Sequence, residues 1–294
     1  MSRWGRSTHD DPGGDQMKVT VVGAGTMGNG IAQVFAMGNH EVVLNDVYPE
    51  ALEKARRNIL SSLTRLNGKG LLKDPEDAIM ARIKFTGDIS EGKGSDLFIE
   101  AVLEQPELKK QVFKTINGLA DENSIIASNT SSISINLLSR EVNDPRRFLG
   151  MHFFNPPPVM KLIEIVKCSS TSERVVKMVY EMSKSLGKEP VIVEDFPGFV
   201  SNRVLMPLLR EAILTLEENV ATKNDIDKTM KLGMNHPMGP LELSDFIGLD
   251  VVYDIMQVLF NEFGDVRFKP PVTLRNLVNA GKLGRKTGEG FYKY

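Results

Sequence analysis

His152 and Glu164 are the two residues of this sequence best suited to acid–base chemistry. His152 follows a short apolar stretch and precedes a proline-rich turn, and Glu164 lies within the apolar residues 162–166. A charge within an apolar run is costly unless it is paired, and a carboxylate partner fixes the tautomer of an imidazole and favours its charged form. The pair therefore predicts a general acid/base supplied by two neighbouring strands. Taken singly, His152 could be a satisfied core residue and Glu164 an edge-strand residue facing water.

A serine-rich loop, residues 128–132 with the sequence S-N-T-S-S, adds further polar groups. It follows a strand predicted over residues 125–127, and His152 ends a strand predicted over residues 148–152. Ligands of open α/β sheets bind outside the carboxyl ends of the strands, so we expect the loop and the histidine to face one crevice. On its own, such a loop is equally well explained as a turn or a helix cap.

A glycine-rich stretch near the start of the chain indicates which kind of cofactor could act together with this base. Gly23, Gly25 and Gly28 follow the β-branched residues 18–22 and precede a helical pattern. In a dinucleotide-binding unit, such glycines allow a tight turn, the approach of a pyrophosphate and close packing of helix against strand. The helix N-terminus then favours the phosphate charge. The cofactor-binding residues expected in this loop are Gly23, Gly25, Thr26, Met27 and Gly28.

An acidic residue after the next predicted strand, 42–44, bears on the choice of cofactor. Asp46 can accept hydrogen bonds from both hydroxyls of an adenosine ribose, and it would repel a 2′-phosphate. Neither position 47 nor position 48 is an arginine. The sequence therefore favours NAD over NADP. A glycine motif alone is weak support for this interpretation, but the strand, helix and acid around it supply the required context.

Apolar runs alternate with helical patterns over the first two thirds of the chain. This alternation predicts an α/β fold, namely a Rossmann-type doubly wound, mostly parallel sheet. The predicted strands are residues 18–22, 42–44, 83–85, 97–102, 125–127, 148–152, 162–166 and 191–193, and the longer helices between them are 49–67, 108–120 and 173–186.

The pattern changes at the D-F-P-G sequence of residues 195–198. Beyond it, helical periodicity predicts helices over residues 199–218, 249–263 and 272–280. We therefore expect an NAD-binding domain over 17–195 and an all-helical domain for substrate binding and dimerisation over 196–294. A domain of that size covers its own apolar surface poorly, so the helical domain is also predicted to form a homodimer interface. Residues 1–16 are expected to be a disordered extension or leader.

The composition excludes several classes of function. The 294 residues are 41% hydrophobic and 25% charged, the net charge is -2 and the mean hydropathy is -0.17, as in a soluble globular protein with no electrostatic attraction to nucleic acid or membrane. No apolar segment approaches the roughly 20 residues that span a bilayer. Cys168 is the only cysteine, so we expect a reducing, cytoplasmic location. The four histidines lack metal-ligand spacing, and no metal is expected.

Several motifs, taken together, resemble the L-3-hydroxyacyl-CoA dehydrogenase family over residues 17–294. They occur in order along the chain: V-V-G-A-G-T-M-G, I-E-A-V-L-E, S-N-T-S-S, H-F-F-N-P, K-L-I-E-I, P-G-F-V-S-N-R, H-P-M-G-P-L-E-L-S-D and G-R-K-T-G-E-G-F-Y. The resemblance implies an NAD-dependent oxidoreductase of fatty-acid and butyrate metabolism, which converts (S)-3-hydroxyacyl-CoA to 3-ketoacyl-CoA and back. The chain length is similar to the branch that acts on 3-hydroxybutyryl-CoA, rather than to the multifunctional fatty-acid oxidation proteins.

The resemblance also implies roles for individual residues. His152 would take the proton of the 3-hydroxyl group, and Glu164 would hold and polarise that histidine. The side chains that would position the substrate oxygens are Ser131 and Asn202, and those that would line the cofactor site, beside the glycine loop, Asp46 and Ser131, are Glu104, Lys109, Asn155 and Lys286. The family's CoA contacts do not carry over cleanly, because Ala55 and Ser62 occupy that neighbourhood; the basic residues nearby are Arg56, Arg57, Arg65 and Lys69.

Other interpretations stay open at this point. One is a related NAD-dependent dehydrogenase that acts on a free hydroxy acid or sugar acid, which would use a lysine base in the hydroxyisobutyrate type. Another is a non-catalytic NAD-binding protein, which would not need the base. A serine hydrolase is disfavoured because the sequence has no G-x-S-x-G elbow.

Overall fold

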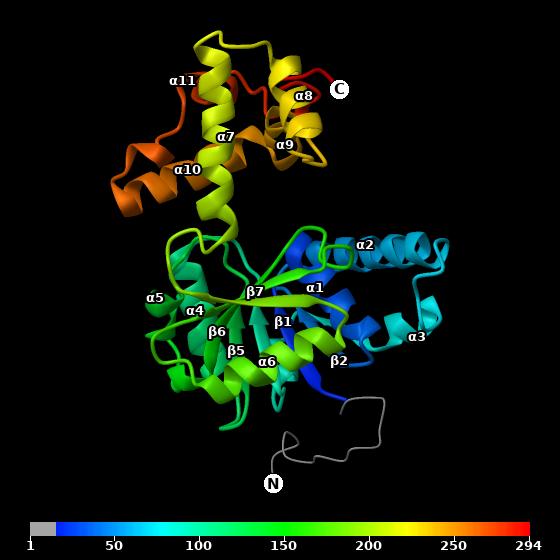
Figure 1. Ribbon diagram of the computed structural model, residues 1–294. Helices are drawn as coiled ribbons and strands as arrows, with labels where there is room; N and C mark the ends of the chain where they lie inside the picture. The colour runs from blue at the N-terminus through cyan, green and yellow to red at the C-terminus, as the bar shows by residue number, and fades with distance from the viewer. Residues whose placement is uncertain (1–15) are drawn as a thin grey trace. The chain divides into compact units, whose positions relative to one another are not determined.

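The computed structural model describes residues 16–294 and divides them into two compact units (Figure 1). One unit ends at Asp195, and the other spans Phe196–Tyr294. The disordered extension or leader was predicted for residues 1–16, and all of these except Gln16 lie outside the described residues. Within the described residues no helix is both long enough and apolar enough to cross a membrane.

The first unit is built on one eight-stranded sheet with the order β3-β2-β1-β4-β5-β6-β7-β8. All neighbouring strands are parallel except β6 and β7, which are antiparallel. This confirms the predicted doubly wound, mostly parallel sheet. The strands are β1 (Lys18–Val22), β2 (Glu41–Asn45), β3 (Ile83–Thr86), β4 (Leu97–Glu100), β5 (Ile125–Ser128), β6 (Phe148–Phe153), β7 (Leu162–Lys167) and β8 (Glu189–Glu194).

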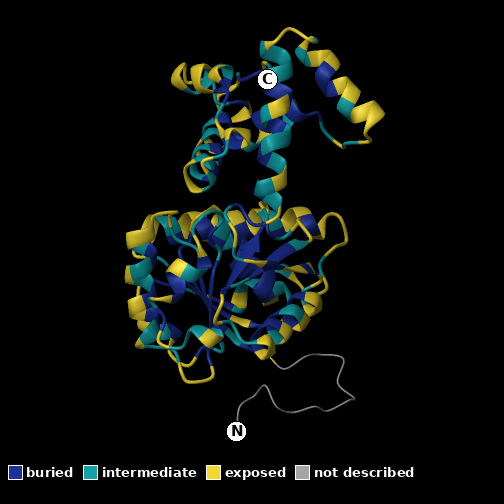
Figure 2. Ribbon diagram, turned by 60° about the vertical axis from the view of Figure 1, so that its left-hand side comes forward, coloured by how far each residue is buried: buried dark blue, intermediate teal, exposed yellow. Residues whose placement is uncertain are grey.

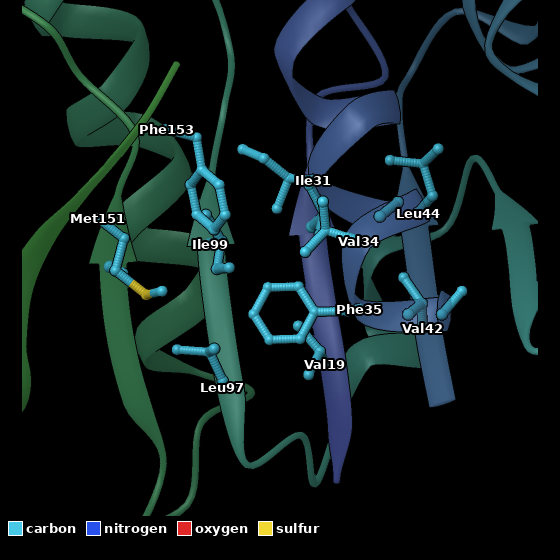
Figure 3. Close-up of a cluster of buried hydrophobic side chains, with 14 of the residues drawn as sticks. Val19, Ile31, Val34, Phe35, Val42, Leu44, Leu97, Ile99, Met151 and Phe153 are labelled. Atoms are coloured by element: carbon cyan, nitrogen blue, oxygen red, sulfur yellow. The ribbon is translucent and has the colours of Figure 1, made fainter. Parts of the chain in front are cut away.

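Helices cover both faces of this sheet, which is why its central strands are continuous apolar runs. On one face, Phe35 of α1 (Thr26–Met37) packs among Val19, Leu97 and Met151 of the strands (Figure 3). On the other face, Phe113 of α4 (Pro106–Asn117) meets Phe148 of β6 edge to face, with ring centroids 5.2 Å apart. The helices of the unit are α1 (Thr26–Met37), α2 (Pro49–Asn67), α3 (Glu76–Ala81), α4 (Pro106–Asn117), α5 (Ile135–Ser139) and α6 (Glu173–Ser185).

The burial pattern follows from these layers. Within the sheet unit, the central strands are buried while the outer helix faces and much of the edge strand β8 are exposed (Figure 2). In α2, for example, Leu52, Ala55, Ile59 and Leu63 are buried at helical spacing, and the residues between them are mostly exposed. The sheet unit therefore has its own core and fixes the carboxyl ends of its strands rigidly.

The end of β4 differs from the sequence prediction. The strand was expected to continue to residue 102, but it ends at Glu100. The reason is local, because the backbone N–H of Val102 donates to Glu100 Oε1 at 2.8 Å. The chain thereby turns at a charged side chain that lies inside the fold.

The second unit consists of helices around a separate core. Its helices are α7 (Ser201–Glu217), α8 (Lys223–Gly233), α9 (Pro240–Ile247), α10 (Leu249–Phe263) and α11 (Val272–Asn279). Helix α9 was not among the helices predicted from the sequence. Its Pro240 occupies the first turn, where the missing N–H costs nothing.

Buried carboxylates hold this helical unit together. Asp227 of α8 accepts hydrogen bonds from the backbone N–H groups of Leu241 at 2.8 Å and Glu242 at 2.9 Å, at the start of α9. Asp245 of α9 accepts from Phe291 N at 2.9 Å and Tyr292 N at 2.8 Å, near the end of the chain. The motifs around residues 236–245 and 284–292 therefore have a structural role within this unit.

Candidate active site

The register of β6 with β7 pairs His152 directly with Glu164. His152 Nδ1 lies 2.7 Å from Glu164 Oε2. The histidine is 8% exposed and the glutamate 1% exposed, so this is a buried charge-assisted contact. The ring of Phe154 lies against the imidazole, with centroids 4.7 Å apart. Two residues that are twelve apart in the chain thus form one compact acid–base unit.

The glycine loop joins β1 to α1 in the geometry that the sequence analysis expected. Gly23 has a φ of +103°, a conformation that side chains rarely adopt, and it lies against the backbone of Ala101. A Cβ on Gly28 would collide with the carbonyl oxygen of Gly23. A Cβ on Gly25, by contrast, would meet nothing within 4 Å. The loop is therefore tight on its inner side and open beside Gly25, at the N-terminus of α1.

Asp46, which directly follows β2, is held beside this loop. Its Oδ2 accepts a hydrogen bond from Ala24 N at 2.8 Å, and its Oδ1 accepts one from Tyr48 N at 3.0 Å. Val47 and Tyr48 are both exposed. Two backbone donors therefore orient the carboxylate while leaving acceptor capacity on both oxygens.

A second acidic residue, Glu100, lies at the carboxyl end of β4 and is fully buried. Its Oε1 accepts from Lys109 Nζ at 2.7 Å, and its Oε2 accepts from Ser128 Oγ at 2.6 Å. Lys109, on α4, is only 1% exposed, and its ammonium also lies 3.1 Å from Glu104 Oε2. One buried lysine is therefore shared by two carboxylates.

Glu104 connects this lysine to the serine-rich loop. Its Oε1 accepts from Thr130 Oγ1 at 2.5 Å and from the backbone N–H groups of Ser131 at 2.9 Å and Ser132 at 3.0 Å. Burial alone would raise the pKa of Glu104, but the Lys109 ammonium and these donors outweigh it and hold the pKa below its usual value. Glu104 is therefore an ionised acceptor around which the loop is ordered.

The serine-rich loop is also tied to the histidine strand. Asn129 N donates to Glu100 O at 2.8 Å, and Asn129 Oδ1 accepts from Phe153 N at 3.0 Å. The residue after His152 is thus fixed to the end of β5. The predicted groups of the sheet unit are therefore connected through neighbouring strands. The glycine loop and Asp46 follow β1 and β2, and the Glu100–Lys109–Glu104 cluster and the serine-rich loop follow β4 and β5. The His152–Glu164 pair lies on the next strands, β6 and β7.

Three further residues were predicted for the site: Asn155, Asn202 and Lys286. Asn155 is exposed, in the segment between β6 and β7. Asn202 and Lys286 belong to the helical unit. Asn202 is largely buried on α7, and its backbone N–H donates to Gly198 O at 3.1 Å, while Lys286 pairs with Asp250 at 2.6 Å.

Of the basic residues considered for CoA, the three arginines lie on α2 and Lys69 lies just beyond its end; all four are exposed, whereas Ala55 is buried. The guanidinium of Arg56 lies 4.2 Å from the centre of the Phe85 ring. That contact gives Arg56 a cation–π partner within the sheet unit. The other basic residues of this set are Arg57, Arg65 and Lys69.

Sequence reasoning missed Glu100 as a member of this site. The available signal was an acidic residue at the end of the apolar run L-F-I-E, where a charge must be paired. Its partners could not be found from spacing, because Lys109 is 9 and Ser128 is 28 residues away. Within residues 16–294, no group of three or more histidine, cysteine or acidic side chains is arranged to hold a metal ion.

A doubly wound sheet with this glycine loop and acidic residue defines a Rossmann-type nucleotide-binding unit. Family comparison agrees, since residues 18–196 match the 3-hydroxyacyl-CoA dehydrogenase NAD binding domain and residues 198–294 match the C-terminal domain of the same family. The chain belongs to the 3-hydroxyacyl-CoA dehydrogenase family and is an oxidoreductase with an NAD(H)-binding domain.

Individual relatives support this assignment. A probable 3-hydroxybutyryl-CoA dehydrogenase of Deinococcus radiodurans is 48% identical over 278 residues, which cover 95% of this chain and 100% of the relative. A 3-hydroxybutyryl-CoA dehydrogenase of Clostridioides difficile is 45% identical, over 95% of this chain and 99% of the relative. The crystal structure of (S)-3-hydroxybutyryl-CoA dehydrogenase from Ralstonia eutropha has a TM-score of 0.91 and 46% identity, covering 95% of this chain and 99% of that one.

Proposed function

We propose that this enzyme oxidises (S)-3-hydroxyacyl-CoA, with 3-hydroxybutyryl-CoA as the main substrate, to the 3-ketoacyl-CoA, and that it catalyses the reverse reduction. The substrate is inferred from the names of the relatives, which match over nearly their whole length. The observation that carries the chemistry is the buried contact of 2.7 Å between His152 Nδ1 and Glu164 Oε2. A binding protein would not need such a pair.

His152 is proposed as the general acid/base. A neutral ring that donates its Nδ1 hydrogen to Glu164 has Nε2 as its proton-accepting nitrogen. During oxidation, Nε2 takes the proton of the 3-hydroxyl group, and during reduction it returns a proton to the 3-keto oxygen. Glu164 stabilises the imidazolium that forms and prevents the wrong tautomer. Ser131 and Asn202 are proposed to orient the substrate oxygens.

The sheet unit has the features that NAD requires. The open space beside Gly25 at the N-terminus of α1 admits a pyrophosphate, and the helix dipole favours its charge. Asp46 would accept the adenosine ribose hydroxyls and repel a 2′-phosphate, so we propose a preference for NAD over NADP. Lys109 and Glu104 would line the nicotinamide end. When bound, NAD supplies the acceptor for the hydride that leaves C3 of the substrate.

Two further assignments rest on the resemblance rather than on contacts, and a third rests only on the charge and exposure of basic residues. Asn155 and Lys286 are proposed to contact the cofactor. The basic residues of α2, with Arg57 and Arg65 foremost, are proposed to meet the phosphates of CoA. Substitution of Arg57 by alanine should raise the KM for acetoacetyl-CoA while leaving that for free acetoacetate unchanged.

The deciding experiment is an NADH-oxidation assay with acetoacetyl-CoA, longer 3-ketoacyl-CoAs and free acetoacetate, repeated with NADPH. We expect the highest kcat/KM with acetoacetyl-CoA and NADH. Activity on free acetoacetate alone would instead identify a dehydrogenase of free hydroxy acids. Absence of turnover on every thioester would refute the proposed function.

We also propose that the chain forms a homodimer through its helical unit and is located in the cytoplasm. The helical unit exposes several large apolar side chains, and where such residues adjoin they mark an interaction surface. The most exposed of them are Val204, Val220, Leu232, Met234 and Val266. Sedimentation velocity should give the mass of a dimer, and a monomer at micromolar concentration would contradict this proposal.

A further inference from the structure

We propose that Glu100 is a positioning residue of this enzyme, which acts through Lys109 and Glu104 on the serine-rich loop. The inference rests on the proposed function, because Ser131 in that loop is the residue proposed to orient the substrate. It goes beyond that function because it assigns a role to a buried side chain that lies behind the residues proposed to meet ligands.

Glu100 is enclosed by partners from its own unit. Its side chain is 0% exposed, and both oxygens are occupied. Oε1 accepts from Lys109 Nζ at 2.7 Å and Val102 N at 2.8 Å, while Oε2 accepts from Ser128 Oγ at 2.6 Å. A side chain bonded in this way cannot touch a substrate, so any effect on catalysis must pass through its neighbours.

The charge of Glu100 determines where the Lys109 ammonium lies. That ammonium is almost fully buried and is stable there only because carboxylates surround it. Glu100 is the closer partner, at 2.7 Å compared with 3.1 Å for Glu104. Without the charge on Glu100, Glu104 would be the only one of the two carboxylates left to balance Lys109, and the lysine would draw it closer.

Such a movement would disturb the serine-rich loop, because the two oxygens of Glu104 have different partners. Oε2 faces Lys109, whereas Oε1 accepts from Thr130 Oγ1, Ser131 N and Ser132 N. Pulling Oε2 toward the lysine takes Oε1 away from the loop. The charge at position 100 therefore fixes the position of the Ser131 backbone.

A second route, made of hydrogen bonds through an uncharged serine and called here the neutral route, connects Glu100 to the same loop. Ser128 Oγ donates to Glu100 Oε2 at 2.6 Å and accepts from Thr130 N at 3.2 Å. Because β4 and β5 pair Glu100 with Ser128 in register, this route is part of the sheet. The route through Glu104 reaches Thr130, Ser131 and Ser132, and the route through Ser128 reaches the backbone N–H of Thr130.

The test uses Glu100→Gln, which keeps the shape of the side chain and removes its charge. Three quantities are measured: kcat/KM for acetoacetyl-CoA, NADH binding by fluorescence, and hydrogen exchange of a peptide that covers residues 126–134. We expect kcat/KM to fall by up to about 100-fold, as for a misplaced reacting group, and exchange of the peptide to accelerate. Asp227→Asn is the matched control, since it also neutralises a buried, hydrogen-bonded carboxylate but lies in the helical unit. It should lower thermal stability without changing exchange of the loop.

A double-mutant cycle separates positioning from general destabilisation. If Glu100 acts by placing Ser131, Glu100→Gln should cost much less in a Ser131→Ala background than in the wild type. Equal fold losses in both backgrounds, or unchanged loop exchange, would overturn the inference. If Glu100→Gln does not fold, Ser128→Ala cuts the neutral route alone and should still accelerate exchange; unchanged exchange there overturns the inference as well. Inactivity of the wild type on thioesters would refute the proposed function, whereas loop exchange would still decide the role of Glu100.

Discussion

His152 and Glu164 are directly opposed in the antiparallel pairing of β6 with β7, and His152 Nδ1 lies 2.7 Å from Glu164 Oε2. The sheet is parallel at every other neighbouring pair. The antiparallel pairing of β6 with β7 brings together two residues that are only twelve apart in the chain. A short, hairpin-like connection is enough to pair these two strands. A parallel pair would need a crossover connection of about a dozen residues or more.

This relationship predicts different outcomes for the two partners. His152→Gln removes the proton acceptor, and kcat should fall by about 10²- to 10⁴-fold. Glu164→Gln keeps a hydrogen-bond acceptor but loses the charge that stabilises the imidazolium, so its loss should be smaller and confined to kcat. Steady-state kinetics with acetoacetyl-CoA, together with NADH binding as the control, checks this. A Glu164→Gln enzyme with wild-type turnover would contradict the proposed orientation of the histidine.

The glycine loop predicts a contrast between two alanine substitutions. A methyl group at Gly25 meets no protein atom within 4 Å, so Gly25→Ala should keep the wild-type melting temperature but weaken NADH binding by filling the open space. A methyl group at Gly28 collides with the carbonyl of Gly23, so Gly28→Ala should destabilise the fold itself. Thermal melts with and without NADH distinguish the two cases. Equal melting temperatures for both variants would show that the close approach of α1 to β1 is not needed.

Sequence alone predicted the sheet well because buried parallel strands are continuous apolar runs separated by amphipathic helices. The sequence also predicted that His152 and Glu164 are partners, since each is an ionisable residue in or beside an apolar strand and needs a partner there. It could not find the partners of Glu100, because these depend on which strand lies beside β4 and on the path of α4. It missed helix α9, although Pro240 lies in the first turn of that helix, a position where proline is favoured.

The Asp46 carboxylate predicts the cofactor preference. Asp46→Asn keeps the acceptor for Ala24 N but removes the negative charge that would repel a 2′-phosphate. The ratio of kcat/KM for NADH to that for NADPH should therefore fall by about tenfold, which corresponds to about 1.4 kcal/mol. Kinetics with both cofactors at constant ionic strength provide the measurement. An unchanged ratio would assign the discrimination to other residues.

Lys188 predicts a pH dependence of stability that is independent of catalysis. Its ammonium is buried and donates to Pro157 O at 2.5 Å and Met160 O at 2.8 Å, in the segment that joins β6 to β7. Burial lowers the pKa of Lys188 from 10.5 to about 8. Between these values the unfolded chain binds more protons than the folded one, so the stability due to this group rises with pH. It is complete above the unfolded pKa and is lost as the pH falls through about 8.

The matched variant for this prediction is Lys188→Met, which fills the same space and cannot titrate. The free energy of unfolding of the wild type, relative to Lys188→Met, should rise steadily from pH 7.5 to pH 10, a range set by the pKa of about 8. Urea unfolding at several pH values measures this difference, and Lys184→Met provides a control at an exposed lysine on α6. Because a neutral amine still has two N–H donors for the two carbonyls, the segment should stay in place across this range. A difference that does not change with pH would show that Lys188 keeps its ordinary pKa despite its burial.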